Sequence, residues 1–203
     1  MQRMVSTGIQ ILDRQLGGGI PQGSTVLFTA PPASQSELVL ARLAKTNTTL
    51  YLTTGRPEAS VQTTVEQGRA TGSTVSIAEV REEPLERASA VLRSDDLPEL
   101  VIVDRVGDLE DCDEEAFQDL LWMLAGREET AVVFYGLSGA AASQRDQTTY
   151  VADMVLNLEL ASGDEKLENR LYVPKFRGGS ALDEPVKLEL AGRVFVDTSR
   201  EIA

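Results

Sequence analysis

Short, uninterrupted apolar runs bounded by polar or turn-forming residues are the feature that most limits how this chain can fold. Residues 100–103 and residues 131–135 are the clearest of these runs, and both are too short to form helices. Such runs are typical of strands buried on both faces of a parallel sheet. Segments with helical spacing of apolar residues, including 36–45 and 114–125, lie between the runs. The alternation predicts an α/β fold with a mostly parallel sheet.

The pattern changes after residue 150, where strand-like segments follow one another without intervening helices. Consecutive strands of this kind predict an antiparallel extension of the parallel sheet. A length of 203 residues suits one α/β domain, so we expect a single domain over residues 1–203 with short flexible termini. The other expected strands are 24–29, 49–53, 74–77, 154–160, 167–173, 186–190 and 193–196, and the other expected helices are 57–71 and 84–92.

Residues 30–37 connect the first of these strands to a helix, which is where a phosphate-binding loop would lie. The working pattern is G-x-x-x-x-G-K-[ST], whose backbone amides and lysine bind phosphate and whose hydroxyl binds Mg²⁺. Here Ala30 and Gln35 take the glycine positions, Ser36 takes the lysine position and Glu37 takes the hydroxyl position. A carboxylate at that point repels a triphosphate. Together with Ala33 and Ser34, these residues form a degraded phosphate loop with no catalytic group.

The segments that flank this loop closely resemble the opening of RecA-superfamily ATPases of the KaiC and RadA type. Residues 6–9 read STGI, residues 12–13 read LD and residues 16–24 read LGGGIPQGS, as in that family. The prolines at 31 and 32 and the serine at 34 also stand where the family often has them. The resemblance implies a RecA-like P-loop NTPase core with three α/β/α layers, extended by antiparallel strands at the C-terminus.

The same resemblance implies the loss of a second catalytic part. In these ATPases, the strand after the first helix ends in paired glutamates that polarise the attacking water. The matching positions here are Gly55 and Arg56, so no carboxylate in this motif can orient water. We therefore expect no catalytic residue and no cofactor. ATP with Mg²⁺ would bind only if the degraded site still holds it.

Two features of the family pattern remain. Residues 98–104 have the form of a Walker B strand, in which Asp104 would hold Mg²⁺ through water. An aspartate that ends a buried strand also caps the following loop, and we favour this structural role. Arg105 follows directly, and we hypothesise that it neutralises the site by pairing with Glu37 or Asp104.

The second remaining feature is the sequence of residues 171–179, which resembles the K-x-R-G segment of KaiC-type domains. In that family the lysine and arginine reach across a subunit boundary toward the γ-phosphate of the neighbour. The equivalent residues, Lys175 and Arg177, would project from one face of a strand. They are candidates for a trans-acting or interface role, and the alternative is that they are solvated charges on a hairpin.

The net charge of the chain indicates what kind of environment and partners suit it. The 32 acidic residues exceed the 19 basic ones, giving a net charge of −13, and only four residues are lysines. This composition resembles that of proteins from salt-loving archaea; the alternative is an acidic mesophilic protein with a basic partner. The acidity opposes nucleic-acid binding, as does a loop at 136–147 with a single arginine. We expect that segment to be a flexible surface loop.

Several classes of site and location can be excluded or disfavoured. The chain has no histidine and one cysteine, Cys112, which rules out an internal disulfide and sites built from imidazole or several thiolates. The acidic run at 111–115 matches no Ca²⁺ loop, so we expect no metal site. No apolar run approaches 20 residues and no secretory signal is visible, so we expect a cytoplasmic protein without a membrane span.

The sequence therefore favours a noncatalytic RecA/KaiC-like domain, a pseudo-ATPase that acts as a regulatory or scaffold partner through protein–protein contacts. The expected partner is a protein, either a RecA/KaiC-type paralogue or another copy of the chain. One alternative is a nucleotide-binding protein or weak ATPase with an atypical site. Another is an accessory factor in DNA recombination or repair.

Overall fold

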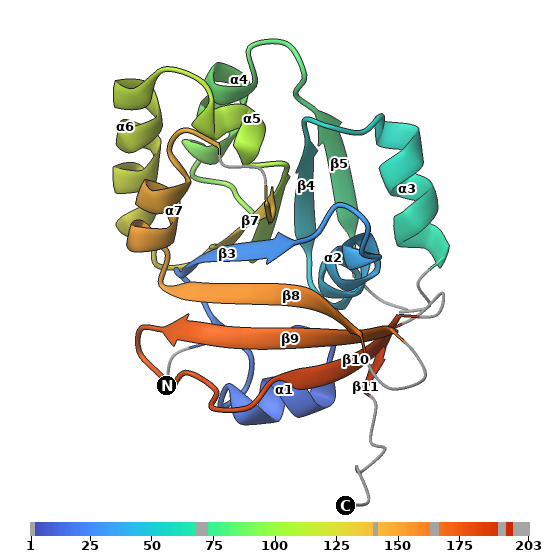
Figure 1. Ribbon diagram of the computed structural model, residues 1–203. Coiled ribbons are helices and arrows are strands. Elements are labelled where there is room, and N and C mark those ends of the chain that lie inside the picture. The colour runs from blue at the N-terminus through green and yellow to red at the C-terminus, as the bar shows by residue number, and fades with distance from the viewer. Residues whose placement is uncertain (1–2, 68–72, 140–141, 163–166, 191–193, 197–203) are drawn as a thin grey trace, which may run out of the picture.

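The computed structural model describes residues 3–67, 73–139, 142–162, 167–190 and 194–196 (Figure 1). The extreme termini, for which the sequence predicts flexibility, lie outside these ranges. In the described part of the chain, none of the helices is long and apolar enough to cross a membrane.

A nine-stranded sheet of described residues, in the order β11-β10-β9-β8-β3-β7-β6-β4-β5, forms the centre of the fold. Its first six strands along the chain run parallel to one another, and the last three continue it antiparallel (Figure 1). The expected mostly parallel sheet with an antiparallel extension is thus confirmed. The parallel strands are β3 (Thr25–Ala30), β4 (Thr49–Thr53), β5 (Val75–Glu79), β6 (Leu100–Asp104), β7 (Ala131–Leu137) and β8 (Met154–Ser162), and the others are β9 (Leu167–Phe176), β10 (Val186–Leu190) and β11 (Val194–Val196).

Helices cover both faces of this sheet and create two apolar cores. One core joins Phe28 and Ile102 to helices α2 (Ser36–Thr46) and α3 (Glu58–Gln67). The other joins Leu27 and Val103 to the helices on the opposite face. Because neighbouring strand residues point to opposite faces, both must be apolar, which explains the uninterrupted runs. The opposite-face helices are α4 (Pro84–Leu92), α5 (Gly107–Glu110), α6 (Glu114–Ala125) and α7 (Arg145–Val151).

The family-like segment at residues 6–24 has a structural role. It contains helix α1 (Gln10–Gln15) and the short strand β2 (Ile20–Pro21), which pairs with β1 (Met4–Val5) just before the segment. Asp13 accepts hydrogen bonds from the Thr7 backbone amide at 2.7 Å and the Ser6 hydroxyl at 2.6 Å. Gly19 has a φ of +125°, and a Cβ there would overlap the Val5 carbonyl oxygen. These contacts explain the serine, threonine, aspartate and glycine without any ligand.

Two expectations about the chain's elements need correction. Residues 136–147 are not wholly a loop, because β7 extends to Leu137 and α7 begins at Arg145; residues 140–141 lie outside the described ranges. The second correction is that the structure contains two short helices, α1 and α5, in segments for which the sequence predicted no helix. Most other element boundaries agree with the predicted ones within about two residues. The strand expected to end at residue 173 continues to Phe176. Parts of the expected 57–71 helix and 193–196 strand lie outside the described ranges.

Candidate functional site

The degraded loop lies between the end of β3 and the start of α2, where the sequence predicts it. Ser34 donates its backbone amide to the Pro31 carbonyl at 3.0 Å and its hydroxyl to the same oxygen at 2.6 Å. Ser36, in the lysine position, is buried and shares a 2.7 Å hydrogen bond with the Tyr135 hydroxyl. The loop is therefore held by hydrogen bonds to its own Pro31 carbonyl. Ser36, which replaces the lysine, is hydrogen-bonded to Tyr135 of β7 in the sheet.

Asp104 stands at the end of β6, and its carboxylate is held by two neighbours. The Arg56 guanidinium donates to Asp104 Oδ2 at 2.7 Å, and the Tyr51 hydroxyl donates to the same oxygen at 2.7 Å. Arg56 also donates to the Tyr51 oxygen at 3.1 Å. The Asp104 side chain is only 3% exposed. A buried carboxylate requires such partners, and here the partner cation is at a position where the sequence resemblance implies a glutamate.

The hypothesis that Arg105 neutralises Asp104 or Glu37 is wrong. Arg105 donates to the two Asp108 carboxylate oxygens at 2.9 and 3.2 Å. A Cβ added at Gly55 would lie 2.8 Å from the Arg105 Nε atom. Arg105 thus occupies the space in which a side chain at position 55 would stand, while Arg56 supplies the positive charge.

These groups surround a small cavity of about 220 Å³. Typical ligand cavities of about 300–1,000 Å³ are larger. Two arginines and two carboxylates face the cavity, so it has no clear preference for an anion. Its lining residues are Pro32, Ser34, Ser36, Glu37, Leu40, Gly55, Arg56, Asp104, Arg105, Tyr135 and Leu137; Ala30, Ala33 and Gln35 belong to the predicted loop but do not line the cavity.

Two phenols at the site have raised pKa values. Burial, followed by the Asp104 charge, raises the pKa of Tyr51 well above its usual range. Burial is also the main reason that the pKa of Tyr135 is raised. Unfolded tyrosines ionise near pH 10, so between that pH and the folded pKa the native state binds more protons than the unfolded state. Native stability must then fall as pH rises above about 10.

We expect this effect to be measurable by urea unfolding at several alkaline pH values. The Tyr51→Phe variant should lose less stability than the wild-type chain between neutral pH and strongly alkaline pH, because it has no phenol to ionise on unfolding. Absorbance titration of the folded chain should show the same Tyr51-dependent difference. Equal alkaline losses in both proteins would contradict the assignment.

Lys175 and Arg177 both lie at the C-terminal end of α7, where carbonyl oxygens lack helical partners. Lys175 Nζ donates to the carbonyl oxygens of Thr149 and Tyr150 at 2.7 and 2.8 Å. Arg177 donates to the Tyr150 and Val151 carbonyls at 2.6 and 3.1 Å. The two side chains therefore meet at one place, although β9 ends at Phe176 and Arg177 lies just beyond it. Their trans-acting role stays a prediction.

Arg145, the first residue of α7, forms a buried ion pair with Glu110 that the sequence did not predict. Glu110 is 0% exposed and accepts from Arg145 Nε at 2.8 and 2.9 Å and from the Thr148 hydroxyl at 2.7 Å. Arg145 also donates to the Leu137 carbonyl at 3.2 Å. The pair joins residues 35 positions apart, and no sequence spacing marks it.

The acidic run around Cys112 has local structural roles. Asp113 caps α6 by accepting from the Ala116 amide at 2.9 Å, and Cys112 donates to the Asp108 carbonyl at 3.2 Å. Within the ranges that the structure describes, no cluster of three or more acidic or cysteine side chains is arranged to hold a metal ion.

The fold is similar to the folds of two solved archaeal protein structures. The fold is similar to that of the KaiC-like protein PH0186 from the hyperthermophilic archaeon Pyrococcus horikoshii OT3, with a TM-score of 0.77 and 16% identity over 97% of this chain and 99% of that one. It is also similar to the flagellar accessory protein FlaH from Methanocaldococcus jannaschii, with a TM-score of 0.79 and 15% identity over 98% and 100% of the two chains.

At such low identity, the likeness establishes a RecA/KaiC-like fold and nothing about activity. No curated protein matched the sequence. A family model does match residues 4–203, nearly the whole chain, and the protein therefore belongs to the family of unknown function DUF7125.

Proposed function

We propose that this protein is a noncatalytic KaiC-like domain, a pseudo-ATPase that acts through contacts with a protein partner. The observation that supports this best is the Arg56–Asp104 ion pair at 2.7 Å. An arginine from the position of a catalytic glutamate binds the carboxylate that would otherwise hold Mg²⁺ through water. Metal binding would require Asp104 to exchange its arginine partner for a hydrated metal ion, with Glu37 on the lining of the same cavity.

The proposal predicts that the chain alone will release no phosphate from MgATP above a protein-free blank. Asp104→Asn is the matched control, since it removes the metal-binding carboxylate and nearly preserves its shape. Equal background signals from both proteins would support the proposal and assign any trace turnover to a contaminant. Turnover by the wild-type chain that Asp104→Asn abolishes would contradict it.

The partner surface that we propose is the groove between α4 and α6, called here the α4–α6 groove. Its volume is about 680 Å³. Among the described residues of its lining, the acidic side chains are Glu83, Glu86, Asp113 and Asp119, against a single basic one, Arg93. Leu85, Ala90 and Ala116 supply an apolar part of the same lining.

Trp122 adds an anchor beside this groove. Its side chain is 79% exposed and follows the groove residue Asp119 by one helical turn on α6. Exposed tryptophans are rare and often carry the binding energy of protein interfaces. An apolar lining with an acidic rim fits an amphipathic partner helix whose polar face is basic.

The chain's single tryptophan and single cysteine report on this surface, because Trp122 adjoins the groove and Cys112 lines it. We expect a helical Leu/Lys amphipathic peptide to shift Trp122 emission to shorter wavelength and to slow maleimide labelling of Cys112. The doubly substituted Glu86→Gln/Asp119→Asn chain should bind more weakly, and Glu159→Gln on the exposed part of β8 should bind normally. Equal responses to a scrambled peptide would contradict the surface assignment.

A further inference from the structure

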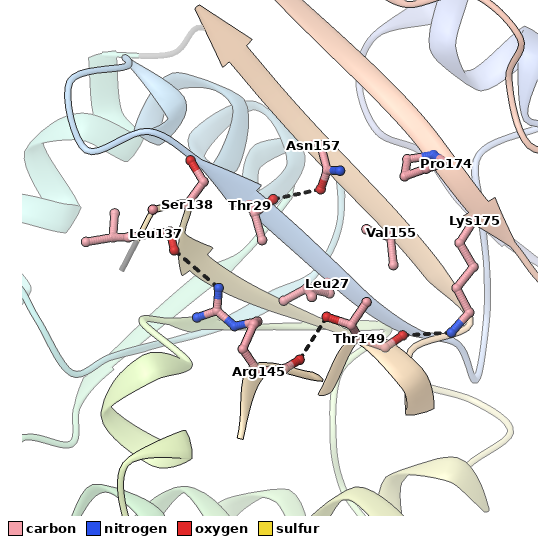
Figure 2. Close-up of a pocket in the computed structure, with 11 residues that line it drawn as sticks. Leu27, Thr29, Leu137, Ser138, Arg145, Thr149, Val155, Asn157, Pro174 and Lys175 are labelled. Carbon is pink, nitrogen blue, oxygen red and sulfur yellow. Dashed lines mark hydrogen bonds between the residues drawn. The ribbon is translucent and has the colours of Figure 1, made fainter. Parts of the chain in front are cut away.

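A second cavity, of about 510 Å³, lies between α7 and the face of strands β3, β8 and β9 (Figure 2). It is separate from the degraded phosphate site, and of the lining residues that the structure describes the two cavities share only Leu137. Its volume falls in the usual range of about 300–1,000 Å³ for small-molecule sites. It is lined by Leu27, Thr29, Leu137, Ser138, Gly139, Arg145, Thr149, Val155, Asn157, Pro174 and Lys175.

The charge of this lining is opposite to that of the molecule. Acidic residues outnumber basic ones by 32 to 19 in the chain, yet the described residues that line the cavity include a lysine, an arginine and no carboxylate. The Arg145 charge is balanced by Glu110 at 2.8 Å. Lys175 is held mainly by neutral carbonyl oxygens, so its positive charge is the less compensated of the two.

Hydrogen-bond donors face the same space. The Thr29 hydroxyl donates to Asn157 Oδ1 at 2.7 Å, which orients the Asn157 amide group and leaves its NH₂ group to donate elsewhere (Figure 2). Lys175 uses two of its three N–H groups on the α7 carbonyl oxygens of Thr149 and Tyr150. The side chains of Leu27 and Val155 lie between these polar groups (Figure 2).

We propose that this cavity binds a small organic anion, specifically a carboxylate with a compact apolar body. The carboxylate would accept from the Lys175 ammonium group, since an ionised acceptor strengthens this hydrogen bond. The apolar body would contact Leu27, Val155 and Pro174. Ligand binding here is independent of the proposed loss of ATPase function.

The test uses 4-methylbenzoate as the probe and 4-methylbenzamide as its neutral isostere. Binding to the full chain is measured by saturation-transfer NMR and calorimetry, at the lowest salt that keeps the protein folded. We expect saturable binding of the benzoate at millimolar concentration, and binding of the benzamide weaker by about tenfold or more.

Asn157→Asp is the decisive variant, because it preserves the acceptor for Thr29 and adds a negative charge to the cavity. It should weaken benzoate binding by about tenfold or more. Asn169→Asp, the same change on β9 outside the cavity lining, should leave binding unchanged. Thermal unfolding of both variants confirms that they fold. Absence of saturable benzoate binding, equal binding of the benzamide, or equal effects of the two aspartates would overturn the proposal.

Discussion

Replacing Arg145 with methionine is expected to destabilise the protein by about 3–5 kcal/mol, the usual cost of breaking a buried ion pair. The Glu110 side chain is fully buried and receives its charged hydrogen bonds from Arg145 at 2.8 and 2.9 Å. Without the arginine, the Thr148 hydroxyl would be the only hydrogen-bond donor left to the carboxylate among the described residues. Urea unfolding followed by circular dichroism measures the loss.

The matched control is Arg87→Met, which removes an exposed arginine 3.3 Å from Glu82. Exposed pairs contribute about 0–1 kcal/mol, so the unfolding midpoint of this variant should barely move. Adding Glu110→Gln to Arg145→Met should restore part of the lost stability, because the buried charge is then removed. An Arg145→Met midpoint close to that of the wild-type chain would show that the pair is not a stabilising element.

Replacing Arg56 with methionine is expected to cost about 2–3 kcal/mol, somewhat less than for a fully buried pair because the Arg56 side chain is 30% exposed. The remaining Asp104 carboxylate would be buried with Tyr51 as its hydrogen-bond donor. The same unfolding experiment measures this change.

A double-mutant cycle with Asp104→Asn isolates the interaction between the two residues. The double variant should be more stable than the sum of the single effects predicts, with a coupling of about 1–3 kcal/mol. Additive effects would mean that Arg56 does not stabilise the Asp104 charge. The observation on which the proposed function rests would then be lost.

Much of the fold could be predicted from the sequence because its strands are buried on both faces. Runs such as residues 100–103 have no polar position, and only a covered parallel strand tolerates this. Helix α7 could not be predicted in the same way. Arg145 and Thr148 attach it to Glu110, and the signal for it is a tertiary contact rather than an apolar period.

The sequence indicates which groups of the phosphate-loop pattern are missing from the candidate site. It does not predict the contacts that take their place. Residues 30–37 lack the glycine, lysine and hydroxyl residues at the positions that the phosphate-loop pattern requires. The partner of Asp104 is Arg56 rather than the adjacent Arg105, because successive residues at a strand end point in different directions. Thr53 pairs with Asp104 across β4 and β6, which brings Arg56 close to the carboxylate. A single sequence does not give this register.

Equilibrium titration with nucleotide shows whether the degraded phosphate site has lost nucleotide binding. ATP and ADP are titrated calorimetrically into the full chain in molar KCl, with and without Mg²⁺, and thermal unfolding is measured on the same samples. We expect no saturable heat and no thermal shift at millimolar nucleotide. Saturable Mg²⁺-dependent binding that Asp104→Asn abolishes would contradict it, because Asp104 would then be available to the metal despite Arg56.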